Sequence, residues 1–343
     1  MTGEQPLCTA EEIGYSPIIM KLLVTGAAGF IGYHVTSALL ARGDTVIGVD
    51  NLNAYYDPAL KRARLDRLAS GHGFSFVEAS VSDMGAMERL ATTHADIDVI
   101  VHLAAQAGVG YSLENPLAYT DANVTGQVVM FEAARRLPKL RHVVYASSSS
   151  VYGLNEDVPF RETDRVDRPS SLYAATKRAG ELIAHTYAHL HGIASTGLRF
   201  FTVYGPFGRP DMAPWLFTSA ILEGRPITLY NGGAMKRDFT YIDDIVQGTL
   251  GAIDLRPSSV EARLFNLGNN CPVPLDAFIG AIETATGRKA EILLGPARLT
   301  DVVETFADIA ASAAAFSYQP TTDIETGMAR FVAWYRGYNG IPS

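Results

Sequence analysis

The chain has 343 residues, which is enough for about two domains at roughly 150 residues each. Apolar residues make up 48% and charged residues 19%, so the chain can bury a core and is too hydrophobic for a disordered protein. The 28 basic and 36 acidic side chains leave a net charge of −8, which gives the protein no electrostatic reason to bind nucleic acid or an anionic membrane surface.

Residues 1–17 form a polar N-terminal extension that lacks the basic start and apolar middle of a signal peptide. The two cysteines, Cys8 and Cys271, form no CxxC pair and no disulfide framework. No apolar run approaches the ~18 residues of a membrane span. We therefore expect a cytoplasmic protein.

From residue 18 onward, short apolar runs rich in β-branched residues alternate with helical stretches. Strands are expected at residues 18–25, 45–50, 74–77, 99–103, 142–145 and 196–201, and helices at residues 30–42, 116–136 and 171–191. This alternation predicts an α/β protein with a Rossmann-type, doubly wound parallel sheet. The loops at the carboxyl ends of its strands then lie along one edge, where ligands bind.

After residue 202 proline and glycine become denser and the helical stretches become shorter. We expect a Rossmann-type domain over residues 18–202, with returning segments near residues 239–267. A smaller C-terminal α/β substrate domain is expected over residues 203–238 and 268–343.

A glycine turn joins the first expected strand to the first expected helix. Gly26 permits the tight turn, Gly29 lets the backbone approach a pyrophosphate, and Gly32 lets the helix pack close to the strand. Asp50 ends the second strand, about twenty residues further on, where a carboxylate accepts hydrogen bonds from a ribose 2′-hydroxyl and repels a 2′-phosphate. The glycines alone are a weak signal, but with Asp50 they predict a site for NAD rather than NADP.

Tyr173 and Lys177 lie four residues apart and therefore on one face of the helix at residues 171–191. A phenol titrates near 10, and a nearby ammonium together with the nicotinium charge of bound NAD would lower its pKa. Upstream, the strand at residues 142–145 runs into four serines at residues 147–150. Either feature alone is common on protein surfaces, but together they predict a proton relay beside a hydride acceptor.

Several motifs resemble the extended short-chain dehydrogenase/reductase superfamily: the glycine turn, the LAAQ sequence at residues 103–106, the serine run and the Tyr173–Lys177 pair. Longer stretches are similar to UDP-glucuronate 4-epimerases. In chain order these are residues 50–57 (DNLNAYYD), 102–116 (HLAAQAGVGYSLENP), 145–153 (YASSSSVYG), 171–177 (SLYAATK), 197–210 (GLRFFTVYGPFGRP) and 237–245 (RDFTYIDDI). The resemblance covers nearly the whole chain after residue 18.

The resemblance implies C4 epimerisation of UDP-glucuronate to UDP-galacturonate through a 4-keto sugar, with Ser148, Tyr173 and Lys177 as catalytic residues. It implies cofactor contacts from Gly26, Ala28, Gly29, Phe30, Ile31, Gly32, Asp50, Asn51, Ser80, Val81, Leu103, Ala104, Ala105, Gln106, Asn123, Tyr173, Lys177 and Phe201. It implies substrate contacts from Ser148, Ser149, Ser150, Tyr173, Thr202, Arg209, Arg237 and Asp301. No metal is expected, and the family resemblance implies a homodimer in which the helices at residues 116–136 and 171–191 of two copies form a four-helix bundle.

The two residues after Ser148 distinguish the possible reactions. Related dehydratases carry an acidic pair there and decarboxylases a single glutamate, whereas this chain has Ser149 and Ser150. Removal of water from C5 and C6 needs such a general acid and base, and C4 epimerisation does not. The hydroxyls of Ser149, Ser150 and Thr202 would instead hold the substrate carboxylate out of line with the carbonyl of the 4-keto sugar, which prevents loss of CO₂.

The chain departs from the family pattern at two positions. Ser80 stands where an aspartate commonly contacts the adenine, and the usual glycine before Asp301 is absent. Three alternative functions stay open: 4-epimerisation of a neutral UDP-hexose or UDP-N-acetylhexosamine, decarboxylation of UDP-glucuronate, and a non-catalytic NAD-binding regulator. The intact set of Ser148, Tyr173 and Lys177 counts against the regulator.

Overall fold

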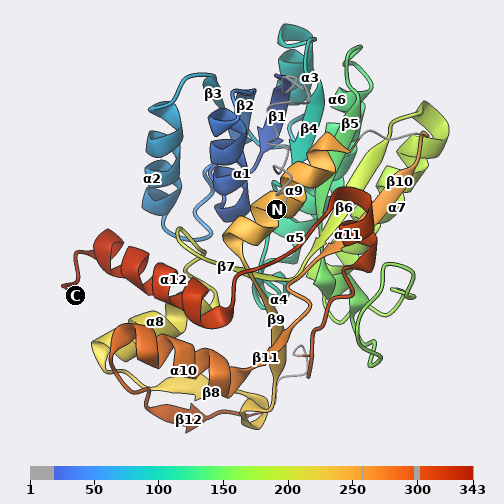
Figure 1. Ribbon diagram of the computed structural model, residues 1–343. Helices are drawn as coiled ribbons and strands as arrows, with labels where there is room; N and C mark the ends of the chain where they lie inside the picture. The colour runs from blue at the N-terminus through green and yellow to red at the C-terminus, as the bar shows by residue number, and fades with distance from the viewer. Residues whose placement is uncertain (1–18, 256–258, 297–301, 343) are drawn as a thin grey trace, which may run out of the picture.

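A large parallel sheet with helices on both faces dominates the computed structural model, which describes residues 19–255, 259–296 and 302–342 (Figure 1). The sheet has seven strands in the order β10-β6-β5-β4-β1-β2-β3, and every neighbouring pair is parallel. The order runs outward in both directions from the pair β1 and β4. The predicted Rossmann-type, doubly wound architecture is therefore confirmed.

The strands of this sheet are β1 (Lys21–Thr25), β2 (Thr45–Asp50), β3 (Phe74–Glu78), β4 (Val99–His102), β5 (His142–Ser148), β6 (Ser195–Phe200) and β10 (Ala262–Leu267). The helices along this part of the chain are α1 (Phe30–Ala41), α2 (Pro58–Ala69), α3 (Met84–Thr93), α4 (Tyr111–Glu114), α5 (Pro116–Tyr119), α6 (Gly126–Ala134), α7 (Leu172–His191) and α9 (Ile242–Asp254). Two short helical turns, η2 (Thr120–Thr125) and η3 (Ser149–Tyr152), interrupt this series.

The central strands are buried on both faces because helices cover each side of the sheet. Leu22 and Val24 of β1 belong to one apolar cluster, to which α1 and α9 contribute. Leu23, between them, points to the opposite face and joins a second cluster with α3, α6 and α7. This alternation with a period of two explains why β1 appears in the sequence as a continuous apolar run.

The smaller region, in the lower part of Figure 1, combines short strands with helices. Its elements are β7 (Thr202–Tyr204), α8 (Ala213–Glu223), β8 (Ile227–Leu229), η4 (Asn231–Gly233), β9 (Lys236–Tyr241), β11 (Pro272–Pro274), α10 (Leu275–Thr286), β12 (Ile292–Leu294) and α12 (Ile324–Asn339). Helix α11 (Ala310–Phe316) instead packs against β10 and α9, at the large sheet (Figure 1). β9 pairs with β7 and β11, whereas β10, later in the chain, lies in the large sheet. The chain thus passes between the two regions more than once, and the domain boundaries given above stay a proposal.

Two elements differ from the prediction in ways that affect the site. The single helix expected at residues 116–136 is divided into α5, a π-helical turn (η2) and α6. The strand expected to end at residue 145 continues to Ser148, because Ser147 and Ser148 still pair with Arg199 and Phe200 of β6.

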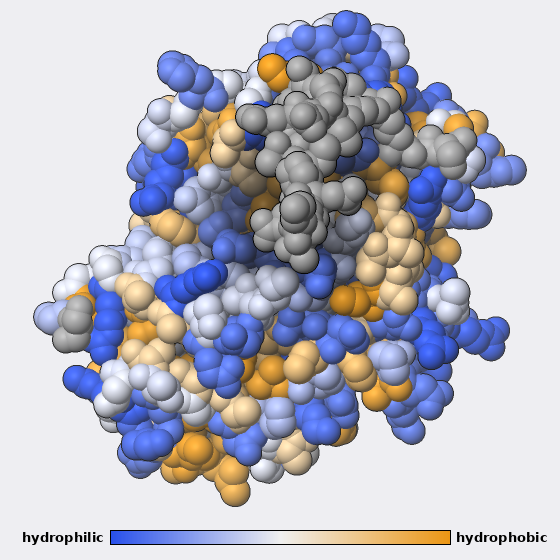
Figure 2. Space-filling view, viewed as in Figure 1, coloured by the Kyte–Doolittle hydropathy of each residue, from blue (hydrophilic) through white to orange (hydrophobic). Residues whose placement is uncertain are grey.

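The face seen in Figure 2 is mainly hydrophilic, with apolar residues in scattered patches. One strand with exposed apolar side chains is β12, whose three residues are all exposed. Within the described ranges, no helix is both long enough and apolar enough to cross a membrane.

Candidate active site

A cavity of about 630 Å³ lies at the carboxyl edge of the large sheet. Its wall includes sixteen of the eighteen predicted cofactor residues. They are Gly26, Gly29, Phe30, Ile31, Gly32, Asp50, Asn51, Ser80, Val81, Leu103, Ala104, Ala105, Gln106, Tyr173, Lys177 and Phe201. Ser148 and Arg209 from the predicted substrate set share the same wall.

The glycine turn leaves backbone exposed where a side chain would block the cavity. Gly26 has a φ of +72°, and a Cβ on it would lie 2.8 Å from the Ala104 nitrogen. A Cβ on Gly29 or Gly32 would lie 2.9 Å or 2.0 Å from the Gly26 oxygen. Gly29 is also the N-cap of α1, and no side chain of the described residues caps this end. The free N–H groups and the positive end of the helix dipole therefore fit the pyrophosphate of NAD.

The two predicted cofactor residues that do not line the cavity, Ala28 and Asn123, support its wall instead. The Ala28 amide donates to Asp50 Oδ2 at 3.2 Å. Asn123 accepts from the Gln106 amide at 2.8 Å and donates to the Gln106 carbonyl at 3.0 Å. Its Nδ2 also lies 3.0 Å from Thr176 Oγ1 on α7. Asn123 thus ties the loop after β4 to the helix that carries Tyr173.

Lys61 of α2 is a cavity residue that the sequence analysis missed. Its Nζ donates to Asn53 Oδ1 at 2.9 Å and lies 3.9 Å from Asp50 Oδ1. The side chain is almost fully buried, and burial lowers its pKa while the charge of Asp50 opposes the shift. A sequence signal existed, since Lys61 falls on the same helix face as the buried Leu60, Arg64 and Leu68.

The adenine end of the expected cofactor site contains a carboxylate from an unexpected place. Ser80 Oγ lies 2.9 Å from Ser82 Oγ, which in turn donates to Asp121 Oδ2 at 2.9 Å. Asp121 belongs to the π-helical turn and lines the cavity. Asp121 thus supplies an acidic group near the position where Ser80 replaces the usual aspartate.

Tyr173 and Lys177 project from the first turns of α7 into the cavity. Lys177 Nζ donates to the Ala146 carbonyl at 2.8 Å and lies 6.0 Å from the Tyr173 ring centre. Burial lowers the pKa of Lys177 to about 8. Burial also raises the pKa of Tyr173, while a hydrogen bond with Ser148 and the positive charge of Arg209 act to lower it. Burial is the largest of these effects, so the pKa of Tyr173 lies above its usual value, and Ser148 and Arg209 are the neighbours that favour the phenolate.

Arg209 lines the cavity and forms an ion pair with Asp211. Its guanidinium contacts Asp211 through Nε at 3.0 Å and Nη2 at 2.5 Å, and Tyr55 donates to the same carboxylate at 2.9 Å. Burial acts to lower the pKa of Arg209, but the ion pair with Asp211 outweighs it and raises the pKa. Sequence reasoning selected Arg209 and missed Asp211 and Tyr55.

The remaining predicted substrate residues lie outside the described cavity wall. Ser149 and Ser150 form the start of η3, and Thr202 begins β7. Arg237 of β9 donates to the carbonyls of Lys236 and Val303 at 2.9 and 3.3 Å. Asp301 lies outside the described residues.

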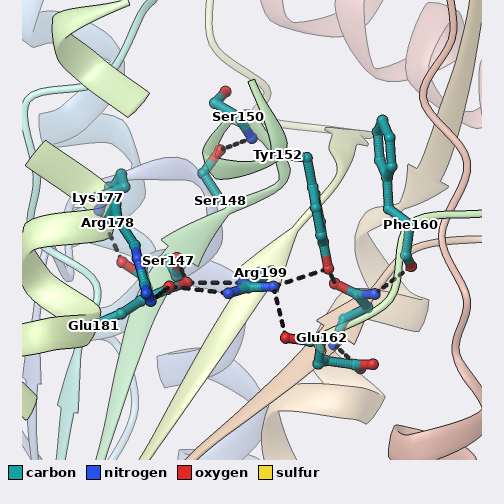
Figure 3. A network of polar contacts seen from close by, with 12 residues as sticks. Ser147, Ser148, Ser150, Tyr152, Phe160, Glu162, Lys177, Arg178, Glu181 and Arg199 are labelled. Atoms are coloured by element: carbon teal, nitrogen blue, oxygen red, sulfur yellow. Dashed lines mark hydrogen bonds and ion pairs between the residues drawn. The ribbon is translucent and has the colours of Figure 1, made fainter. Parts of the chain in front are cut away.

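A buried polar network that the sequence analysis did not anticipate lies beside Ser148 and Lys177, two of the predicted catalytic residues (Figure 3). Glu181 of α7 and Arg199 of β6 form its centre, and the side chain of each is only 1% exposed. Local sequence patterns do not predict it, because Glu181 lies 18 positions from Arg199 and 34 from Ser147 along the chain.

Comparisons with known proteins agree with this geometry. The model of the NAD dependent epimerase/dehydratase family matches residues 22–268. UDP-glucuronate 4-epimerase 1 of Arabidopsis thaliana is 49% identical over 340 residues, which cover 94% of this chain and 78% of that protein. UDP-glucuronate 4-epimerase 3 of the same plant is 49% identical over 337 residues, which cover 93% of this chain and 77% of that protein.

Solved structures give the same result. UDP-glucuronic acid 4-epimerase from Bacillus cereus, in complex with UDP-glucuronic acid and NAD, has a TM-score of 0.87 and 31% identity, with coverage of 93% of this chain and 100% of that chain. UDP-glucose 4-epimerase from Thermotoga maritima, with UDP-glucose, has a TM-score of 0.84 and 29% identity, with the same coverage. With its glycine turn, Asp50 and Tyr173–Lys177 pair in one cavity, this chain belongs to the NAD dependent epimerase/dehydratase family.

Proposed function

We propose that this protein is an NAD-dependent epimerase that interconverts UDP-glucuronate and UDP-galacturonate at C4. The observation that carries the proposal is that Ser148, Tyr173 and Lys177 line one cavity with the glycine turn. The chain is also 49% identical to a named UDP-glucuronate 4-epimerase over almost its whole length.

When bound, NAD supplies the acceptor and donor of the hydride at C4. The glycine turn would hold its pyrophosphate, and Asp50 and Lys61 would flank its adenine-side ribose. Ser80, Val81 and Asp121 would contact the adenine. Lys177, whose ammonium donates to the Ala146 carbonyl at 2.8 Å, would bind the nicotinamide ribose.

Tyr173 performs the proton transfer. Its phenolate removes the proton from O4, directly or through the Ser148 hydroxyl, as C4 is oxidised. The 4-keto sugar, now trigonal at C4, then turns in the cavity and is reduced on its opposite face. Tyr173 returns the proton to O4, so the reaction consumes no external oxidant or reductant.

The proposed substrate-binding side chains are mainly basic groups and hydroxyl donors, because a UDP-sugar acid is anionic. Arg209 and Arg237 would face the anionic UDP-sugar, and Ser149, Ser150 and Thr202 would hold the uronate carboxylate. Asp301 would contact the uridine ribose. An acidic protein needs such local cationic groups to bind a diphosphate.

A homodimer built from α5, α6 and α7 is part of the proposal. Leu117, Leu182 and Leu190 on these helices are more than half exposed, which suits burial against a second copy. Size-exclusion chromatography with light scattering tests this assembly. Localisation in the cytoplasm stays a prediction.

Incubation of the purified protein with UDP-glucuronate tests the function. We expect UDP-galacturonate without net NADH or CO₂, and deuterium placed at C4 should remain in the product. Release of CO₂ would indicate a decarboxylase, and faster turnover of UDP-glucose would indicate an epimerase of neutral sugars. Binding of NAD without turnover of any UDP-sugar would indicate a regulator.

A further inference from the structure

Glu181 continues the catalytic face of α7 into the core. Tyr173, Lys177 and Glu181 are spaced by four residues, so they lie one above another along the helix. Glu181 is 3% exposed, and the mechanism proposed above gives it no proton to move. Its carboxylate is nevertheless held by several partners.

Four hydrogen bonds surround the Glu181 carboxylate (Figure 3). Arg199 donates from Nε to Oε1 at 2.8 Å and from Nη2 to Oε2 at 3.0 Å, which is a two-point contact. Ser147 Oγ donates to Oε1 at 2.7 Å, and Arg178 Nη1 donates to Oε2 at 2.9 Å. The carboxylate thus links α7 to β5 and β6 in one fixed geometry.

Arg199 is held from its other side as well. Its Nη1 donates to the Tyr152 hydroxyl at 3.1 Å, and that hydroxyl donates to Asn266 Oδ1 at 2.7 Å. Asn266 Nδ2 donates to the carbonyls of Phe160 and Asp308 at 2.9 and 3.0 Å. The guanidinium therefore has little freedom to move away from Glu181.

The contacts of α7 converge on the end of β5, next to the predicted catalytic serine. Lys177 donates to the Ala146 carbonyl, and Glu181 accepts from the side chain of Ser147. These are the two residues that precede Ser148. Ala146, Ser147 and Ser148 all line the cavity. Since side chains alternate along a strand, fixing the Ser147 side chain toward Glu181 directs the Ser148 side chain to the opposite side of β5.

Stability alone does not account for the buried Glu181–Arg199 pair. Desolvation of two charges offsets much of their attraction, and well-packed apolar residues often serve equally well or better. What the pair supplies is orientation, because a two-point contact fixes both partners.

From these contacts we propose that Glu181 is a positioning residue for the reaction: held by Arg199, it fixes Ser147 and thereby sets Ser148 against Tyr173. The inference rests on the proposed epimerase function, because it concerns the same catalytic hydroxyls. Glu181 itself touches neither the substrate nor the cofactor in this scheme.

Two variants and a matched control test the proposal, with UDP-glucuronate as substrate. Glu181→Gln should lower kcat by about tenfold to a hundredfold with KM changed less than about threefold, because misplaced catalytic groups slow the chemical step more than binding. Ser147→Ala removes one hydrogen bond to a charged group and should lower kcat by about threefold to tenfold. Tyr145→Phe is the control, since its buried hydroxyl has no hydrogen-bond partner among the described residues, and it should keep the kcat of the unmodified protein.

The pH profile separates positioning from a general loss of stability. The hydrogen bond with Ser148 lowers the pKa of Tyr173, so displacement of Ser148 should move the rise of kcat to higher pH. Thermal unfolding and NAD binding, measured on each variant, establish that it is folded. If Glu181→Gln does not fold, Ser147→Ala still decides the question, because it introduces no unpaired charge.

A Ser147→Ala variant with unchanged kcat and pH profile would overturn the inference, whatever its melting temperature. An unmodified protein that fails to epimerise UDP-glucuronate would instead overturn the proposed function. The two failures are therefore distinguishable.

Discussion

The two sides of the cavity differ in how their residues are held. On the cofactor side, the wall consists largely of backbone, with Gly26, Gly29 and Gly32 in a single turn. On the substrate side, the wall depends on side chains that engage each other, such as Arg209 with Asp211.

The difference follows from what each side must bind. A pyrophosphate is held by backbone N–H groups at a helix end, so the residues that matter are those that leave the backbone bare. A sugar acid is held by charged and polar side chains. One such side chain at the cavity, Arg209, forms an ion pair with Asp211. We therefore expect substitutions on the cofactor side to affect folding and NAD binding, and substitutions on the substrate side to affect KM.

The largest loss of activity is expected at Tyr173, where the cofactor side and the substrate side of the cavity meet. Tyr173→Phe removes the proposed base and should lower kcat by about 10² to 10⁴-fold, the usual contribution of general acid–base catalysis. NAD binding should change little, because the aromatic ring stays. Steady-state kinetics and cofactor titration check both; more than a tenth of the original kcat in this variant would contradict the mechanism.

The cofactor side should not tolerate a side chain at Gly32. A Cβ there would lie 2.0 Å from the Gly26 oxygen, so Gly32→Ala should lower the free energy of unfolding by about 3 kcal/mol and weaken NAD binding. Urea denaturation measures the change.

Gly280→Ala is the matched control. Gly280 lies inside α10, and a Cβ there meets no described atom within 4 Å. Alanine should raise the free energy of unfolding by about 0.5–1 kcal/mol through its helix propensity. Equal destabilisation by both substitutions would mean that the tight turn is not the cause.

On the substrate side, Arg209→Met should act on binding instead. Loss of one charged contact with the anionic substrate should raise KM for UDP-glucuronate by about tenfold, with NAD affinity unchanged. The positive charge of Arg209 also lowers the pKa of Tyr173, so the rise of kcat should move to higher pH. Arg225→Met, at an exposed ion pair with Glu223, should leave both quantities unchanged; an equal effect there would show that the cause is general charge.

The smallest effect concerns His34 of α1, which connects the two sides by donating to the Pro206 carbonyl at 2.8 Å. Burial lowers the pKa of His34 to about 4, whereas an unfolded histidine titrates near 6.5. Between these values the unfolded chain binds a proton that the folded protein does not. The free energy of unfolding should therefore fall as pH decreases from about 6.5 to 4, by up to about 1.4 kcal/mol per pH unit from this group.

Comparison with His34→Gln isolates that contribution, because glutamine does not titrate and keeps an N–H donor. Urea denaturation at pH 7, 6 and 5 should show a smaller loss of stability in acid for the variant. Identical slopes for the two proteins would exclude His34 as a source of the pH dependence.

Elements with a local signal were predicted well. The order of strands and helices, the glycine turn and the helix pair of Tyr173 and Lys177 all depend on periodicity or spacing over a few residues. The π-helical turn was missed, because its Asn123 is held by Gln106, seventeen residues away.

Lys61 and Asp121 were missed for a similar reason. Each is a charged residue on a helical segment; the helix face of Lys61 indicates burial, but no local pattern indicates that either residue lines a cavity. Their importance arises from where the segment packs, next to Asp50 and to the Ser80–Ser82 pair.

The amino-acid order by itself determined the sheet, the glycine turn and the helix face that carries Tyr173 and Lys177, because backbone conformation and side-chain periodicity are local properties. Only the tertiary structure decided which charged side chains form pairs. It places Glu181 against Ser147, and it pairs Arg209 with Asp211. Such pairings depend on distances of a few ångströms between segments far apart in the chain, and packing of the whole molecule sets those distances.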